Sequence, residues 1–194
     1  MAKKSIAKNY LYNLSYQILT LILPLITASY LARVLGARGN GIYIYTYTIV
    51  NYFVLFGSLG ISMYGQREIA YVQNNKTKKK KIFIELVLFR FITISIASVI
   101  YYLSFARQGE YSSYYKILFF ELIAAAFDIS WFFQGMEDFK KTVLRNIAVR
   151  LISVGLIFLI VKQESDLNKY LAIYAFADLL GNISLWFYLP KYFK

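Results

Sequence analysis

The chain has 194 residues, of which 59% are hydrophobic, 19% aromatic and only 16% charged, yet its formal net charge is +12. Soluble domains are about half apolar and about a quarter charged, so this composition excludes an ordinary soluble globular enzyme. The chain has no cysteine and no histidine, which excludes disulfide frameworks, thiolate nucleophiles, imidazole bases and the zinc sites built on these residues. We therefore expect a protein that is not an enzyme.

Long apolar segments follow one another along the chain. Residues 9–32 and 39–66 carry no charge over 24 and 28 residues, and about 20 apolar residues suffice to cross a bilayer as a helix. In chain order, the expected membrane helices cover residues 10–32, 42–64, 82–105, 114–133, 147–161 and 170–189. The segments are continuously apolar rather than alternating, which favours helices over barrel strands. The sequence predicts an all-α, polytopic membrane bundle of about six transmembrane helices in a single domain, residues 1–194.

A shorter amphipathic segment precedes the fifth expected helix. Apolar residues recur at helical spacing over residues 136–146, with Lys140, Lys141 and Arg145 between them. Such a pattern is typical of a helix that lies on a membrane surface with its apolar side toward lipid. We expect an interfacial helix here, on the cytoplasmic side.

The basic residues predict the orientation of the bundle. Fifteen of the 22 Lys and Arg lie in alternate connections, namely the N-terminus, residues 65–81, residues 134–150 and the C-terminus, and six lie in the other three connections. Cytoplasmic loops carry the excess of basic residues, so both termini are expected in the cytoplasm. The run Lys76–Lys81 has no interleaved aromatic residues, so we interpret it as a topology anchor rather than as a nucleic-acid or anionic-lipid site.

Four ionisable residues fall inside expected membrane helices: Arg90, Glu121, Asp128 and Asp178. At about 1.5 Å per residue, Arg90 and Asp128 lie roughly 12 Å and 9 Å from the cytoplasmic end of their helices, level enough to pair. Either they form a buried pair or they belong to a transport path. Glu121 and Asp128 share one face of the fourth helix. A polar cavity is the simplest surrounding for Asp178, and snorkelling or protonation is the alternative.

Several local segments carry a family resemblance: Lys8–Leu14, Ala32–Ala37, Tyr64–Ala70 and Phe127–Lys141. The most specific part is the sequence WFFQG at Trp131–Gly135. With these segments the chain resembles the N-terminal half of a Wzx-type polysaccharide flippase, which handles O-antigen or capsule repeat units. That family belongs to the multidrug/oligosaccharidyl-lipid/polysaccharide exporter superfamily.

The resemblance implies one lobe of a two-lobe (MATE-like) helical transporter that works by alternating access around a cationic cavity. Its substrate would be an undecaprenyl-diphosphate-linked oligosaccharide, translocated across the bacterial cytoplasmic membrane. On this basis Arg33, Arg38 and Arg90 are candidate diphosphate contacts, and Glu121, Asp128 and Asp178 are candidate coupling or gating groups. We expect no catalytic residue, metal site or cofactor, apart from Na+ or H+ as a coupling ion.

Members of that family carry two lobes in one chain, whereas residues 1–194 would form one. The chain is therefore expected to be a fragment, to pair with a second half, or to form a homodimer. Its expected partners are the lipid bilayer and the lipid-linked oligosaccharide, with no nucleic acid. Two other functions stay open: a cation-coupled drug or small-molecule exporter of the same superfamily, and a non-transporting partner of polysaccharide assembly.

Overall fold

The computed structural model describes residues 6–193, and within that range the protein is helical with no strand. The helices, in chain order, are α1 (Ile6–Val34), α2 (Gly36–Ser58), α3 (Ile61–Tyr71), α4 (Lys76–Tyr101), α5 (Ser112–Phe127), α6 (Ser130–Gly135), α7 (Phe139–Ile160), α8 (Leu167–Trp186) and α9 (Pro190–Phe193). A π-helical turn (Tyr102–Ala106) extends α4, and a 3-10 turn (Glu164–Asp166) precedes α8.

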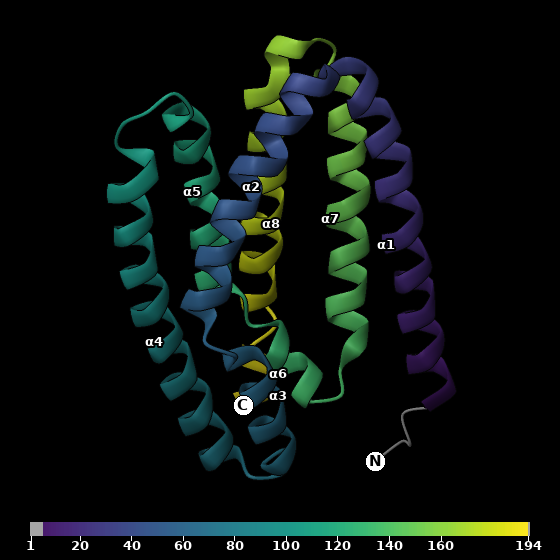
Figure 1. Cartoon of the computed structure of the whole chain (residues 1–194). Helices are drawn as coiled ribbons and strands as arrows, with labels where there is room; N and C mark the ends of the chain where they lie inside the picture. The colour runs from purple at the N-terminus through teal and green to yellow at the C-terminus, as the bar shows by residue number, and fades with distance from the viewer. Residues whose placement is uncertain (1–5, 194) are drawn as a thin grey trace.

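The long helices form a bundle in which each packs against its neighbours around a ring (Figure 1). Helix α1 contacts α2 and α7, α2 contacts α4 and α5, and α5 packs extensively against α8, which in turn contacts α7. The stretch Ser112–Gly135 is the most buried of the apolar stretches, at 56% of its most apolar window, against 17–28% for the others. Helix α5 is therefore the central element of the bundle.

Five helical stretches of the described chain are long and apolar enough to cross a membrane: Gly36–Tyr71, Lys76–Ala106, Ser112–Gly135, Phe139–Ile160 and Glu164–Phe193. They confirm the all-α polytopic membrane bundle, and they correspond to the second to sixth expected helices. The first expected helix, residues 10–32, lies in α1, but most of its side chains before Leu21 fall outside the described residues. Large hydrophobic side chains such as Leu21, Leu25 and Leu159 are at least 70% exposed, as lipid-facing residues would be.

Two of the expected spans are interrupted, and both interruptions lie toward the same end of the bundle (Figure 1). Between α2 and α3 the chain turns through Leu59 (φ 44°) and Gly60 (φ 70°), conformations that an α-helix cannot contain. Between α5 and α6 the helix is broken at Asp128 and Ile129. The short helices α3 and α6 that follow these breaks pack against each other.

The separate interfacial helix expected over residues 136–146 is not formed. Phe139–Ile160 is one continuous helix, α7, that joins this segment to the fifth expected span. The expectation is wrong because Arg145 and Arg150 do not mark a membrane surface. Both line cavities inside the bundle, where a basic side chain is tolerated within a span.

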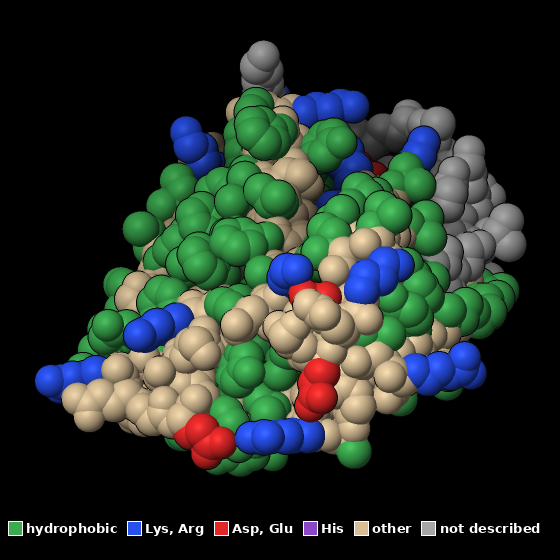
Figure 2. All heavy atoms as spheres, turned by 90° about the horizontal axis from the view of Figure 1, so that it is seen from above, with side chains coloured by type: hydrophobic (Ala, Val, Ile, Leu, Met, Phe, Trp, Pro, Cys, Tyr) green, Lys and Arg blue, Asp and Glu red, His purple; other side chains and the backbone are tan. Residues whose placement is uncertain are grey.

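The chain ends at the same end of the bundle at which α1 begins, as an even number of spans requires (Figure 1). The opposite end holds the α1–α2 turn. Viewed there, Lys, Arg, Asp and Glu side chains are dispersed among hydrophobic ones (Figure 2). Which end faces the cytoplasm stays a prediction. Moving Arg145 and Arg150 from the loop count into the bundle reduces the basic excess but does not reverse it.

The segments that carry the family resemblance interlock. A Cβ atom on Gly65 in α3 would lie 2.6 Å from the Trp131 ring of α6, and one on Gly135 would lie 2.6 Å from the Gln66 carbonyl oxygen. The Gln73 side-chain amide donates to the Gly135 carbonyl at 2.8 Å. The signature residues therefore serve first to hold two broken helices in contact.

Replacing Gly65 with alanine is expected to destabilise the bundle by about 1–3 kcal/mol, the usual cost of overpacking a core. The buried indole of Trp131 is rigid and cannot yield to the added methyl group. Gly41→Ala is the matched control. Its new Cβ would meet nothing within 4 Å, so alanine in that helix should stabilise by about 0.5–1 kcal/mol. Thermal unfolding of the detergent-solubilised chain measures both, and equal stability of the two variants would contradict the interlock.

Candidate functional site

A polar cavity of about 330 Å³ lies among the helices of the bundle and is open on one side. Helices α2, α4, α5, α7 and α8 contribute to its wall, as does the first residue of α6. Its polar side chains are Tyr47, Asn51, Arg90, Glu121, Asp128, Ser130, Arg145, Asn146, Asp178 and Asn182. The polar surrounding expected for Asp178 is thereby confirmed. Four of the six candidate residues from the sequence, Arg90, Glu121, Asp128 and Asp178, line this one cavity.

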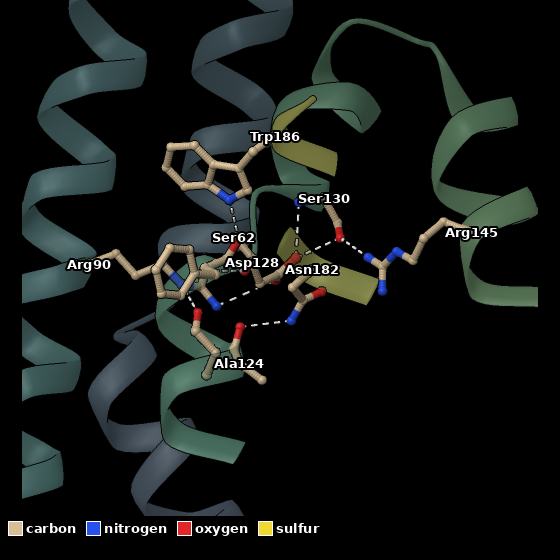
Figure 3. Close-up of polar contacts among 10 residues, drawn as sticks. Ser62, Arg90, Ala124, Asp128, Ser130, Arg145, Asn182 and Trp186 are labelled. Carbon is tan, nitrogen blue, oxygen red and sulfur yellow. Dashed lines mark hydrogen bonds and ion pairs between the residues drawn. The ribbon is translucent and has the colours of Figure 1, made fainter. Parts of the chain in front are cut away.

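Arg90 and Asp128 form an ion pair, one of the two alternatives that their similar depth left open. Arg90 Nη2 lies 3.4 Å from Asp128 Oδ2; Arg90 is 3% exposed, and the Asp128 side chain is 24% exposed. The other nitrogens of Arg90 are also engaged, since Nε donates to the Ala125 carbonyl at 2.6 Å and Nη1 to Ser62 Oγ at 3.0 Å (Figure 3). This guanidinium thus joins α4 to α3 and to the end of α5.

Side chains from two other helices support the break at the end of α5. The last carbonyls of a helix have no partner in the helix itself, and in a membrane water cannot replace it. Besides Arg90, Asn182 donates to the Ala124 carbonyl at 2.7 Å and Trp186 Nε1 to the Phe127 carbonyl at 2.8 Å (Figure 3). Sequence reasoning missed Asn182 and Trp186, because nothing in the sequence marked the end of α5.

Asp128 connects the break to α7. Its Oδ1 accepts from the Ser130 backbone N–H at 2.9 Å and from the Ser130 hydroxyl at 2.5 Å. That hydroxyl also accepts from Arg145 Nη2 at 2.8 Å. The result is a continuous chain of polar contacts, Arg90–Asp128–Ser130–Arg145, which runs across the cavity (Figure 3).

Glu121 is the most isolated acidic group of the cavity. The residue is 8% exposed, and its Oε1 atom is buried and accepts no hydrogen bond from any described residue. Asp178, on α8, faces the same cavity and interacts electrostatically with Arg150 and Arg145. A buried carboxylate oxygen without a hydrogen bond is costly, and binding a proton or a cation removes that cost. Among the described residues, no group of three acidic side chains is placed to hold a metal ion.

Arg33 and Arg38 lie apart from this cavity. Arg33 is in the last turn of α1 and Arg38 near the start of α2. Both are exposed, at the end of the bundle opposite the helix breaks. They are therefore available to a ligand at that membrane surface, whereas the guanidinium of Arg90 is occupied by protein groups.

A second cavity, of about 490 Å³, lies among α1, α2, α7 and α8. Tyr43, Tyr170 and Tyr174 line it, together with Arg150, which donates to the Tyr174 hydroxyl at 3.3 Å. Tyr47 lines the first cavity and packs edge-on against Tyr174 at 5.3 Å between ring centroids. Aromatic rings thus separate the two cavities. The sequence did not identify these tyrosines as cavity residues. The four-residue spacings Tyr43–Tyr47 and Tyr170–Tyr174 nevertheless each predict a shared helix face.

Comparison with known proteins agrees with this architecture. The sequence profile of a family described as "Polysaccharide biosynthesis protein" matches residues 6–194. A protein of Escherichia coli (strain K12) named "Putative O-antigen transporter" is 27% identical over 184 residues, which cover 93% of this chain and 44% of the relative. The chain therefore spans less than half the length of that relative. No solved structure gives a significant match.

Proposed function

The chain belongs to the polysaccharide biosynthesis protein family, and from this premise we propose that it forms one lobe of a flippase. The substrate would be an undecaprenyl-diphosphate-linked oligosaccharide repeat unit, carried from the inner to the outer leaflet of the bacterial cytoplasmic membrane. Both termini would face the cytoplasm. No chemical step is required of the protein, which acts as a transporter rather than as an enzyme.

One observation carries this proposal: a multi-pass membrane bundle of this family holds a charged cavity within its spans. Ionisable residues in a membrane are expensive to maintain and by default mark a substrate or ion pathway. A purely structural bundle would be more stable with apolar residues in place of Glu121 and Asp178, because neither forms an ion pair within 4.0 Å with a described residue.

We assign different tasks to the charged residues. Glu121 and Asp178 are the coupling groups, and a proton on Glu121 would remove the cost of its buried charge. Asp128 is a positioning residue that Arg90 and Ser130 hold in place. Arg90 acts with it, although the sequence also made Arg90 a candidate diphosphate contact. Arg33 and Arg38 remain the diphosphate contacts proposed for the opposite membrane surface.

A second lobe completes the transporter in this proposal. The chain matches 44% of the length of its E. coli relative, and the polar cavity is formed within a single lobe. The second lobe would be a continuation of this chain, another chain or a second copy of this one. Between the lobes the oligosaccharide would cross while its lipid tail stays in the bilayer.

Deletion of the gene, with readout of surface polysaccharide, tests the proposal. We expect loss of the polymer and accumulation of lipid-linked repeat units in the inner leaflet, reversed by the native gene. Unchanged surface polysaccharide together with altered sensitivity to cationic drugs would instead identify a drug exporter. Loss of polymer with normal repeat-unit translocation in vesicles would identify a non-transporting assembly partner.

A further inference from the structure

A groove of about 750 Å³ runs between α7 and α8, outside the polar cavity. Its rim is open to the surroundings, since Leu144, Ile152 and Leu180 are 47%, 61% and 65% exposed. Its floor includes a close contact between the two helices, where a Cβ on Gly181 would lie 2.7 Å from Val149 Cγ2. The groove is therefore a lateral feature of the bundle, accessible from the lipid.

Its charges gather at one end. Asp138, Lys140, Lys141 and Arg145 line the groove, giving three basic groups and one acidic. Asp138 is matched by Lys141, whose Nζ lies 3.5 Å from Asp138 Oδ2 and donates to the Tyr192 hydroxyl at 2.8 Å. Lys140 is exposed and forms no ion pair with a described residue. Lys140 thus places a positive charge at the mouth of the groove that no described acidic side chain pairs with.

The rest of the groove is apolar. From the mouth its wall continues along α7 through Ala148 to Ile152 and along α8 through Ala177. Residues 140 to 152 rise about 18 Å along a helix, so the wall reaches well into the depth of a membrane leaflet. A ligand that fits has a polyanionic head at the membrane surface and an apolar chain directed into the bilayer.

We propose that this groove binds the diphosphate and first isoprenoid units of a polyprenyl diphosphate. This inference rests on the proposed function and gives its lipid substrate a binding site on this chain. Lys140 and Arg145 are five residues apart on α7, about 7.5 Å along the axis. Long Lys and Arg side chains at this spacing can converge on two linked phosphates, which carry more negative charge than a phosphodiester with a single charge. Lys140 contacts the phosphate nearer the membrane surface, and Arg145 contacts the phosphate nearer the isoprenoid chain.

Arg145 connects this groove to the polar cavity. It lines both, its Nη2 donates to Ser130 Oγ at 2.8 Å, and it interacts electrostatically with Asp178. The close packing at Gly181, 3.3 Å from Arg145 Cδ if a Cβ were present, leaves just enough room for this side chain. A diphosphate in the groove therefore competes with Ser130 and Asp178 for one guanidinium. Its binding thus directly changes the interactions of Asp178, one of the coupling groups.

Binding of undecaprenyl diphosphate to the native chain in phosphatidylcholine nanodiscs tests the proposal. Lys140→Gln is expected to weaken binding about tenfold, because a charge-assisted contact to phosphate is lost. Ala148→Phe, which fills the apolar wall, should weaken it by a similar factor. Lys80→Gln is the matched control, an exposed lysine on α4 away from the groove, and should bind as the native chain does. Because Lys140 is exposed, its variant tests the site even if Ala148→Phe fails to fold.

Two results would overturn the site: native affinity in the Lys140→Gln variant, or equally tight binding of phosphatidylglycerol, which would indicate a general anionic-lipid groove. Inorganic diphosphate should bind more weakly than undecaprenyl diphosphate. Its affinity should be the same for the native chain and the Ala148→Phe variant. The outcome is separate from that of the export assay. Lysine-sensitive binding with no role in polysaccharide export would refute the proposed function and leave the groove intact. Normal export with no such binding would refute the groove and leave the proposed function intact.

Discussion

Replacing Arg90 with leucine is expected to destabilise the bundle by about 3–5 kcal/mol, the range seen when one partner of a buried ion pair is removed. The guanidinium is 3% exposed and serves Asp128, the Ala125 carbonyl and Ser62 at once. Its loss leaves the negative charge of Asp128 without a basic group within 4.0 Å among the described residues and removes the shorter of two hydrogen bonds to the Ala125 carbonyl. Chemical unfolding of the purified chain, or the fraction that survives heating in detergent, measures the change.

The same assay on Arg67→Leu gives the control. Arg67 pairs with Glu68 at 3.7 Å, but its side chain is 61% exposed, so its loss should cost less than about 1 kcal/mol. Combining Arg90→Leu with Asp128→Asn should recover part of the stability, because the uncompensated charge is gone. If the double variant is as unstable as the sum of the two single ones, Arg90 and Asp128 are not coupled and their pairing has no energetic role.

Glu121→Gln is expected to leave the fold intact and to abolish coupling. Glutamine keeps the shape of the protonated acid but cannot exchange a proton, so the lobe stays in one charge state. Since the Oε1 atom of Glu121 is buried without a hydrogen bond, removing the charge should preserve or raise stability. Coupling free energies are typically 1–3 kcal/mol, so export of surface polysaccharide should fall by about 5- to 150-fold.

Glu85→Gln is the control for this result, because it makes the same chemical change at a surface site. Glu85 lies 3.8 Å from Lys81 with its side chain 59% exposed, and export should be unchanged. Both variants are compared at equal membrane abundance, with quantification of surface polysaccharide. Native export in the Glu121→Gln variant would remove Glu121 from the coupling mechanism and leave Asp178 to be tested alone.

The interruptions of the spans show where sequence reasoning was insufficient. The second expected helix, residues 42–64, includes Leu59 and Gly60, where the backbone has positive φ. The fourth, residues 114–133, includes the break at Asp128. An apolar run predicts that a segment lies in the membrane but carries little information on its continuity, because hydropathy averages over the residues that break the helix. The stability of each break depends on partners from other helices, such as Asn182 and Trp186.

Arg145 shows the same limit for the site. At the sequence level it is one basic residue among several in an amphipathic stretch, so an interfacial position was predicted. In the folded chain it crosses beside Gly181 to reach Ser130 and faces two cavities. A basic residue near a membrane surface and one inside a bundle have the same local sequence pattern. The two positions differ in whether another helix packs against the face that carries the basic residue.

The sequence by itself determined the all-α membrane architecture, five of its spans in the described residues and the similar depth of Arg90 and Asp128, which the structure then shows to be paired. These follow from composition, segment length and helical rise, which are properties of the chain taken locally. Only the tertiary structure decided that Glu121 and Asp178 share a cavity and that Arg33 and Arg38 lie away from it. It alone also shows the groove between α7 and α8, with basic residues at one end. Such features need helices distant in sequence to pack side by side, and no local pattern specifies that packing.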